Sequence, residues 1–107
     1  MAKVIVEPGV CGFTAEIEAI SEDGMEVKLT VDTGCPAIID MIESLGDTYD
    51  GYEVVFAHPG ANLFYQYATE HNFPQHGGCV TIAGITKAIE AACSLALPTN
   101  ASITFVG

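Results

Sequence analysis

The chain is poor in basic residues. It has three lysines and no arginine, against 14 aspartate and glutamate residues, and its formal net charge is −11. A surface this acidic repels the phosphates of nucleic acids and the anionic headgroups of membranes. We therefore expect neither a nucleic-acid partner nor attachment to a membrane. Two roles remain for the acidic residues: they keep the protein in solution, or they form a face that docks a protein partner.

Long apolar segments are also absent. Half of the 107 residues are apolar, yet no run approaches the roughly 20 residues that a membrane-spanning helix needs. The start of the chain holds no apolar region typical of a secretory signal, because Glu7 and Pro8 end the first apolar run early. We expect a cytoplasmic protein, in which thiols stay reduced and disulfides do not form.

Several catalytic signatures are missing as well. There is no glycine-rich phosphate-binding loop, no readable Ser-His-Asp arrangement and no Cys-x-x-Cys pair. The acidic residues are spread along the predicted solvent faces, so paired carboxylates for general acid–base chemistry are not indicated. The sequence favours a protein that is not an enzyme.

What the sequence does contain is a clear hairpin pattern. Apolar and polar residues alternate from Phe13 to Ile20 and again from Met25 to Asp32. An Asp-Gly pair, which favours tight turns, lies between the two runs. Such alternation predicts strands with one buried face. We expect the two segments to pair antiparallel.

Residues 36–45 are predicted to form a helix. Apolar residues recur there at helical spacing. Pro36 suits the first helical position, and Gly46 suits the position after a helix end. Cys35 would then occupy the N-cap.

The rest of the chain completes an α+β pattern. The other predicted elements are short strands at 2–6 and 102–106, helices at 62–70 and from 80 to about 97, and a segment at 52–56 that fits a strand or a helical turn. We expect a single domain over residues 1–107, with an antiparallel sheet of about three to four strands packed by helices.

Three of the four cysteines lie where the chain turns. Cys11 is followed by glycine, Cys35 stands between glycine and proline, and Cys79 follows two glycines. A thiol that only fills a core needs no such neighbours. Thiolates that bind one metal need such neighbours, because turns and helix starts direct side chains inward and leave backbone N–H groups free to bond sulfur. Cys35 and Cys79 also precede predicted helices, whose positive N-terminal ends favour thiolates.

A histidine is the expected fourth ligand. His76 lies three residues before Cys79, close enough to share a metal ion with it, and His71 is the alternative. We predict a site for zinc or an iron–sulfur cluster, since thiolate and imidazole suit both. Its predicted ligands are Cys11, Cys35, His76 and Cys79.

The fourth cysteine has a different setting. Cys93 falls on the apolar stripe of the last predicted helix, so we expect it to be a packing residue. His58 is a remote candidate ligand. Two other functions stay open: a thiol or persulfide sulfur carrier that uses Cys35 or Cys79, and an acidic protein-interaction domain whose cysteines are reduced core residues.

The order of these motifs resembles that of the NifU/IscU-type iron–sulfur scaffold proteins. It is Cys-Gly at a strand entrance, Gly-Cys at a helix start, and His with Cys before a helix that contains Ala-Ile-Glu-Ala-Ala at 88–92. In that family three cysteines and one histidine hold a [2Fe–2S] cluster or zinc, on a small sheet packed by helices. The resemblance spans about residues 10–92 and implies a role in iron–sulfur assembly or delivery. The ligands it implies are Cys11, Cys35, His76 and Cys79.

The chain departs from that family in three ways. Phe13 stands where the family usually has an aspartate that helps keep the cluster labile. Two glycines separate the histidine from the last cysteine, and a strand is expected after the last helix. The chain also resembles the cysteine-rich TSCPD-type domains. In its segments at 87–90 and 96–98 it looks like a family of uncharacterised small proteins from anaerobes, which implies no settled function.

Overall fold

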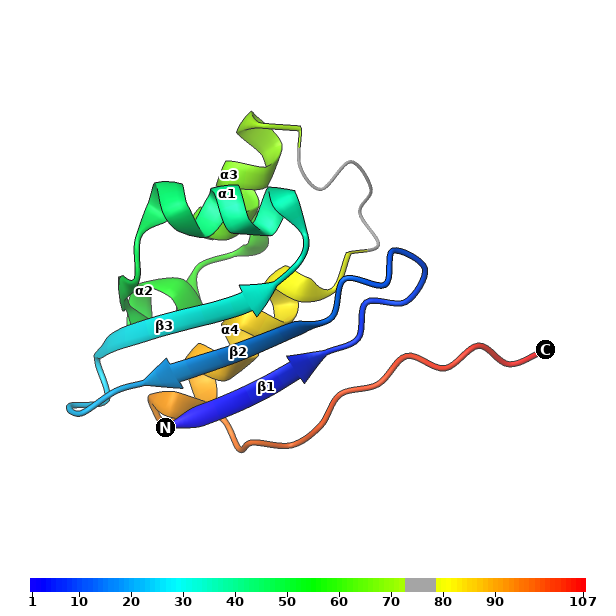
Figure 1. Ribbon diagram of the computed structural model, residues 1–107. Helices are drawn as coiled ribbons and strands as arrows, with labels where there is room; N and C mark the ends of the chain where they lie inside the picture. The colour runs from blue at the N-terminus through cyan, green and yellow to red at the C-terminus, as the bar shows by residue number, and fades with distance from the viewer. Residues whose placement is uncertain (73–78) are drawn as a thin grey trace.

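The computed structural model describes residues 1–72 and 79–107. Its sheet has the strand order β1-β2-β3-β4, and every neighbouring pair is antiparallel. The strands are Ala2–Val6 (β1), Ala15–Ile20 (β2), Glu26–Thr33 (β3) and Thr48–Asp50 (β4). The helices are Pro36–Leu45 (α1), Gly51–Phe56 (α2), Leu63–Glu70 (α3) and Thr81–Ala92 (α4), with a 3₁₀ helix at Pro59–Ala61 (η1). The expected α+β fold, an antiparallel sheet packed by helices, is confirmed (Figure 1).

The predicted hairpin is confirmed by the pairing of β2 with β3. In its turn, Oδ1 of Asp23 accepts hydrogen bonds from the N–H groups of Met25 and Glu26, both at 2.9 Å. Gly24 has a φ of +76°, a left-handed conformation that glycine adopts without steric cost. Local turn chemistry and the alternation of the strands therefore specify the same structure.

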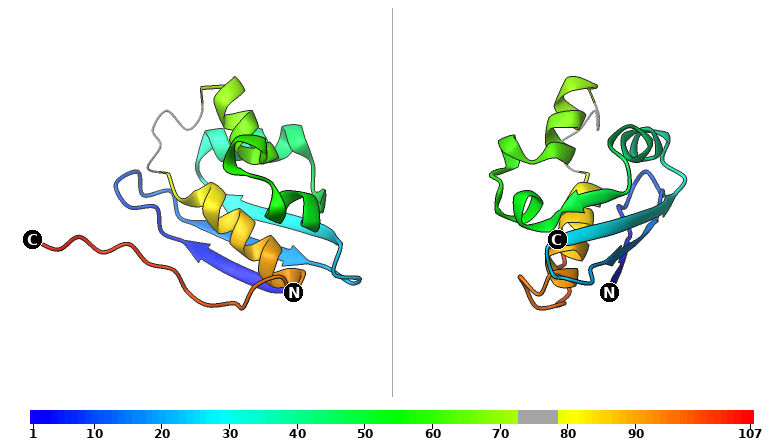
Figure 2. Two further views of the ribbon diagram at one scale, coloured as in Figure 1. Left: turned by 180° about the vertical axis from the view of Figure 1, so that it is seen from behind. Right: turned by 90° about the vertical axis from the view of Figure 1, so that its left-hand side faces the viewer.

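The core lies between the sheet and the helices, which gather on one side of it (Figure 2). Helix α4 crosses the covered face of β1 and β2. Gly84 permits this close approach, because a Cβ at that position would collide with the side chain of Val6 and would lie 3.6 Å from Cδ1 of Ile17. The largest fully buried side chains are Phe64, Ile17, Leu29, Ile38, Met41, Ile82, Ile85 and Ile89.

Two predictions about the C-terminal part are wrong. Helix α4 ends at Ala92 instead of near Leu97, because Ser94 takes a φ of +57° that turns the chain off the helix axis. Residues 102–106 are exposed and form no strand. Alternation shows that a segment suits a strand, but a strand also needs a partner for its backbone hydrogen bonds. None of the described strands pairs with this segment.

Two further details refine the predicted elements. Residues 51–56 form helix α2, so the helical alternative for this segment is correct and the strand is not. The side chain of Asp50 caps the first turn of the helix. Strand β2 begins at Ala15, which leaves Phe13 in the loop before it. Within the described ranges, the helices lack the length and apolar character that crossing a bilayer would require.

Candidate metal centre

Each predicted cysteine ligand lies in a connection rather than inside an element. Cys11 is in the loop between β1 and β2, and it is exposed. Cys35 is the N-cap of α1, directly after β3. Cys79 comes two residues before α4 begins. Cys35 and Cys79 are half-buried.

The register of the sheet brings the first two of these connections to the same end. Val6 at the end of β1 lies opposite Ala15 at the start of β2. Ala15 in turn lies opposite Thr33, the last residue of β3. The loop that carries Cys11 leaves the sheet from this row, and so does the turn that carries Cys35.

Helix α4 brings the third connection to the same end. Gly84, in the first turns of α4, lies against Val6 in the row just described. The helix therefore starts near this end of the sheet and runs toward the other, as Figure 1 shows. Because Cys79 lies two residues before α4, the same packing places Cys79 near this end of the sheet.

A direct contact joins the loop of Cys11 to the turn of Cys35. The ring of Phe13 covers Gly34, and a Cβ at Gly34 would lie 3.3 Å from Cδ1 of Phe13. Phe13 thus packs against the residue directly before Cys35. The N–H of Cys35 donates to the hydroxyl of Thr33 at 3.3 Å, which fixes the start of the turn.

The electrostatics of this end favour anionic ligands. The side chains at the N-caps of α1 and α4, Cys35 and Val80, make no capping hydrogen bond, and neither helix has an acidic residue in its first turn. By contrast, Asp50 caps α2 and Asn62 caps α3. Uncapped helix N-termini present free N–H groups and a partial positive charge. Backbone N–H groups at these two helix ends are thus left without a capping side chain.

The sulfur atoms do not form a complete ligand shell. Among residues 1–72 and 79–107, no three His, Cys, Asp or Glu side chains lie close enough together to hold a metal ion. The predicted ligand His76 lies outside the described residues. The structure thus places three cysteine-bearing segments toward one end of the sheet, without a group of three ligands among the described residues.

His71 has a geometry that suits a ligand. It follows α3 as its C-cap, and its Nδ1 lies 2.9 Å from the carbonyl oxygen of Tyr67. Its ring stacks on that of Tyr67, with 3.9 Å between the centroids. When Nδ1 donates to the carbonyl, Nε2 keeps its lone pair for a metal, as in many metal-binding histidines. His58, in contrast, lies at the N-cap of η1, in a different connection.

Cys93 is a packing residue, as expected. Its side chain is buried beside Gly51, and a Cβ at Gly51 would collide with the Sγ of Cys93. Burial raises the pKa of this thiol, although a hydrogen bond with Ser21 lowers it in part. A thiol held neutral in the core is neither a ready metal ligand nor a ready nucleophile.

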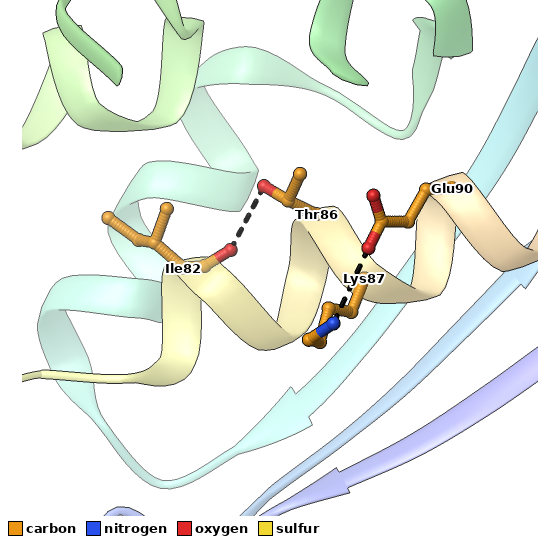
Figure 3. A network of polar contacts seen from close by, with 4 residues as sticks. All are labelled: Ile82, Thr86, Lys87 and Glu90. Atoms are coloured by element: carbon orange, nitrogen blue, oxygen red, sulfur yellow. Dashed lines mark hydrogen bonds and ion pairs between the residues drawn. The ribbon is translucent and has the colours of Figure 1, made fainter. Parts of the chain in front are cut away.

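The polar side chains along α4 have local partners. The hydroxyl of Thr86 donates to the carbonyl of Ile82 at 3.2 Å, and Nζ of Lys87 lies 3.6 Å from a carboxylate oxygen of Glu90 (Figure 3). Glu90 is thus one half of an ion pair on the helix surface. The contact gives no support to a general base at this position.

The comparisons with known proteins identify a family. The model of a family of unknown function, DUF6951, matches residues 2–105. No curated protein and no solved structure matches the chain. The family description names no ligand, activity or partner, and it gives no link to the NifU/IscU-type proteins.

Proposed function

The chain belongs to the DUF6951 family over nearly its whole length, and we propose that it is a small metal-binding protein. Its site would hold zinc or an iron–sulfur cluster through Cys11, Cys35, Cys79 and one histidine. The observation that carries the proposal is that three cysteine-bearing segments, distant in sequence, lie toward the same end of the sheet. A protein that used cysteine only as core packing would have no reason to place three of four in connections at the same end.

The surroundings of the three cysteines fit such a group. The loop of Cys11 contains Gly9 and Gly12, which take φ values of +100° and +71° and have open space around them. This loop can therefore adjust without a clash. The two uncapped helix N-termini would offset the negative charge of a thiolate-bound centre. When bound, zinc would fix the ligands tetrahedrally, whereas a cluster would add iron and sulfide that can be passed on.

The position of the site favours storage or delivery over a structural role. The apolar core is formed by the sheet and the helices, and neither Cys11 nor Cys79 contributes to it. Cys11 is exposed, so a partner protein can reach the site. The acidic surface supplies a face on which such a partner could dock.

The exposure of Cys11 also favours a second candidate function, a sulfur carrier that holds a persulfide. Such a carrier needs an accessible thiol that is not occupied by metal. The two functions differ in a measurable way. A carrier would be free of metal after anaerobic purification and would carry sulfane sulfur that cyanide removes as thiocyanate.

The test is a metal and sulfide analysis of anaerobically purified protein, together with its absorption spectrum. We expect stoichiometric zinc, or iron with sulfide and visible absorption bands. Replacing Cys11, Cys35 or Cys79 with alanine should lower the metal content at least about tenfold, since each removes a ligand. Cys93→Ala is the matched control, and it should keep the metal content of the wild type.

Two outcomes would contradict the proposal. One is wild-type protein without metal; the other is equal loss of metal in all four cysteine variants, which would point to a general effect on folding. The fourth ligand is tested by His76→Ala and His71→Ala in the same assay. We expect His76→Ala to lose metal. If only His71→Ala loses metal, the fourth ligand is His71, at the end of α3.

A further inference from the structure

The C-terminal segment is uncharged, and its last residues leave large apolar side chains exposed. Residues 94–107 contain no charged side chain, in a chain whose net charge is −11. Phe105 and Val106 are 97% and 91% exposed, and Leu97 and Ile103 are also exposed. Segments that stay solvated are usually rich in charge and poor in large apolar residues. Residues 94–107 lack such charge, and their last part leaves Ile103, Phe105 and Val106 in solvent, which favours a segment that binds a surface.

The same segment has the pattern of a strand. Ile103 and Phe105 alternate with Ser102, Thr104 and Val106, and most of these residues have high strand propensity. Residues 102–106 nevertheless form no strand in the structure. What the segment lacks is a neighbour that can accept and donate its backbone hydrogen bonds.

Strand β1 offers a suitable neighbour at the edge of the sheet. Among residues 1–72 and 79–107, β1 pairs with β2 on one side only, and its five residues match the length of 102–106. Ile5, on its uncovered face, is 60% exposed, and Lys3 is its one charged residue. The strand at the other edge, β4, has three residues. An unpaired edge strand of this kind accepts an added strand.

The path of the chain carries its C-terminal end beyond the sheet (Figure 1). Helix α4 ends close to the start of β1, and from there the chain runs beside β1 and past its end (Figure 1, Figure 2). The C-terminus lies well outside the domain, beyond the end of the sheet. The last residues therefore extend past the β1 of their own copy.

We propose that residues 102–106 of each copy add to the free edge of β1 in a second copy. The exchange is reciprocal, because each chain contributes one segment and one edge, and it closes as a two-fold dimer. Each sheet would gain a fifth strand. The segment is uncharged and the edge carries only Lys3, so this contact adds no repulsion of its own between two acidic chains.

The experiment is sedimentation velocity of the full-length protein over a range of concentrations. We expect a dimer for the wild type and a shift toward monomer for either Ile103→Pro or Thr104→Pro. Neighbouring residues of a strand direct their N–H groups to opposite sides, so one of these two variants removes an N–H that bonds to β1. The dissociation constant should rise on the order of tenfold or more. Asn100→Pro is the matched control: it places the same residue in the exposed stretch before the strand and should leave the dimer intact.

A second measurement separates the possible partners. In the dimer, amide hydrogen exchange should be slowed in both β1 and residues 102–106 relative to the proline variant that shifts the protein toward monomer. A wild type that stays monomeric at all concentrations overturns the proposal. If that monomer shows slow exchange in 102–106, the segment has paired with its own β1. Equal dimerisation of the wild type and both proline variants, Ile103→Pro and Thr104→Pro, also overturns it, because the contact then lies elsewhere.

Discussion

At the scale of single residues, one glycine decides how closely helix and sheet pack at the proposed site. Gly84 lies against Val6, with no room for a methyl group. Glycine in a helix interior normally costs stability relative to alanine, by about 0.5–1 kcal/mol. Its presence at this position is explained by the close contact, which also sets where the start of α4, and with it Cys79, lies.

We expect Gly84→Ala to destabilise the protein despite its better helix propensity. Overpacking in a tight core typically costs about 1–3 kcal/mol, which exceeds the gain in propensity. Gly60→Ala is the matched control, since nothing lies within 4 Å of a Cβ at Gly60, and its effect should stay within about 0.5 kcal/mol. Urea denaturation followed by circular dichroism measures both. Equal stability of the two variants would show that α4 can move away from the sheet without loss.

At the scale of secondary-structure elements, the turn of the β2–β3 hairpin makes the stability of the fold depend on pH. The backbone N–H groups of Met25 and then Glu26 lower the pKa of Asp23 from its usual 3.8. A carboxylate whose pKa is lower in the folded state stabilises the fold above its unfolded pKa, and this contribution is lost as the pH falls through the folded pKa.

We therefore expect the wild type to lose stability relative to Asp23→Asn as the pH falls from 6 to below about 4. Asparagine can accept the same two hydrogen bonds but does not titrate, so the comparison cancels the effect of the other carboxylates. Urea midpoints of the two proteins across this pH range provide the measurement. A constant difference between them would exclude Asp23 as a source of acid sensitivity.

Elements whose signals are local could be predicted from the sequence. The hairpin and helix α1 carry their own periodicity and turn or cap residues, and both are confirmed. The prediction of a strand at 102–106 was wrong because a strand needs a partner for its backbone hydrogen bonds, and the sequence pattern of the segment does not identify one. The candidate metal site shows the same limit. The turns at Cys11, Cys35 and Cys79 could be predicted from the sequence, whereas their position toward one end of the sheet depends on strand register and on the packing at Gly84.

At the scale of the whole molecule, the fold and the proposed site are separable. The core runs from the covered face of the sheet through α1, α3 and α4. The cysteine connections lie at one end of it, and only Cys35 packs partly against the core. In zinc fingers, by contrast, the metal replaces a core that is too small, and the apoprotein is unfolded.

We expect removal of the metal to leave the domain folded. A ligand that binds only the native state adds about 2.7 kcal/mol at 100 times its dissociation constant. For a domain of this size that corresponds to a shift in Tm on the order of 10–20 °C. After treatment with a chelator, the far-UV circular dichroism should stay unchanged at 25 °C, and the thermal transition should remain single and cooperative but occur at a lower temperature.

Cys93→Ala should show the same chelator-induced shift in Tm, and Cys35→Ala should show none. If the chelator abolished the far-UV signal instead, the metal would be a structural element and delivery to a partner would be excluded, because losing the cargo would unfold its carrier.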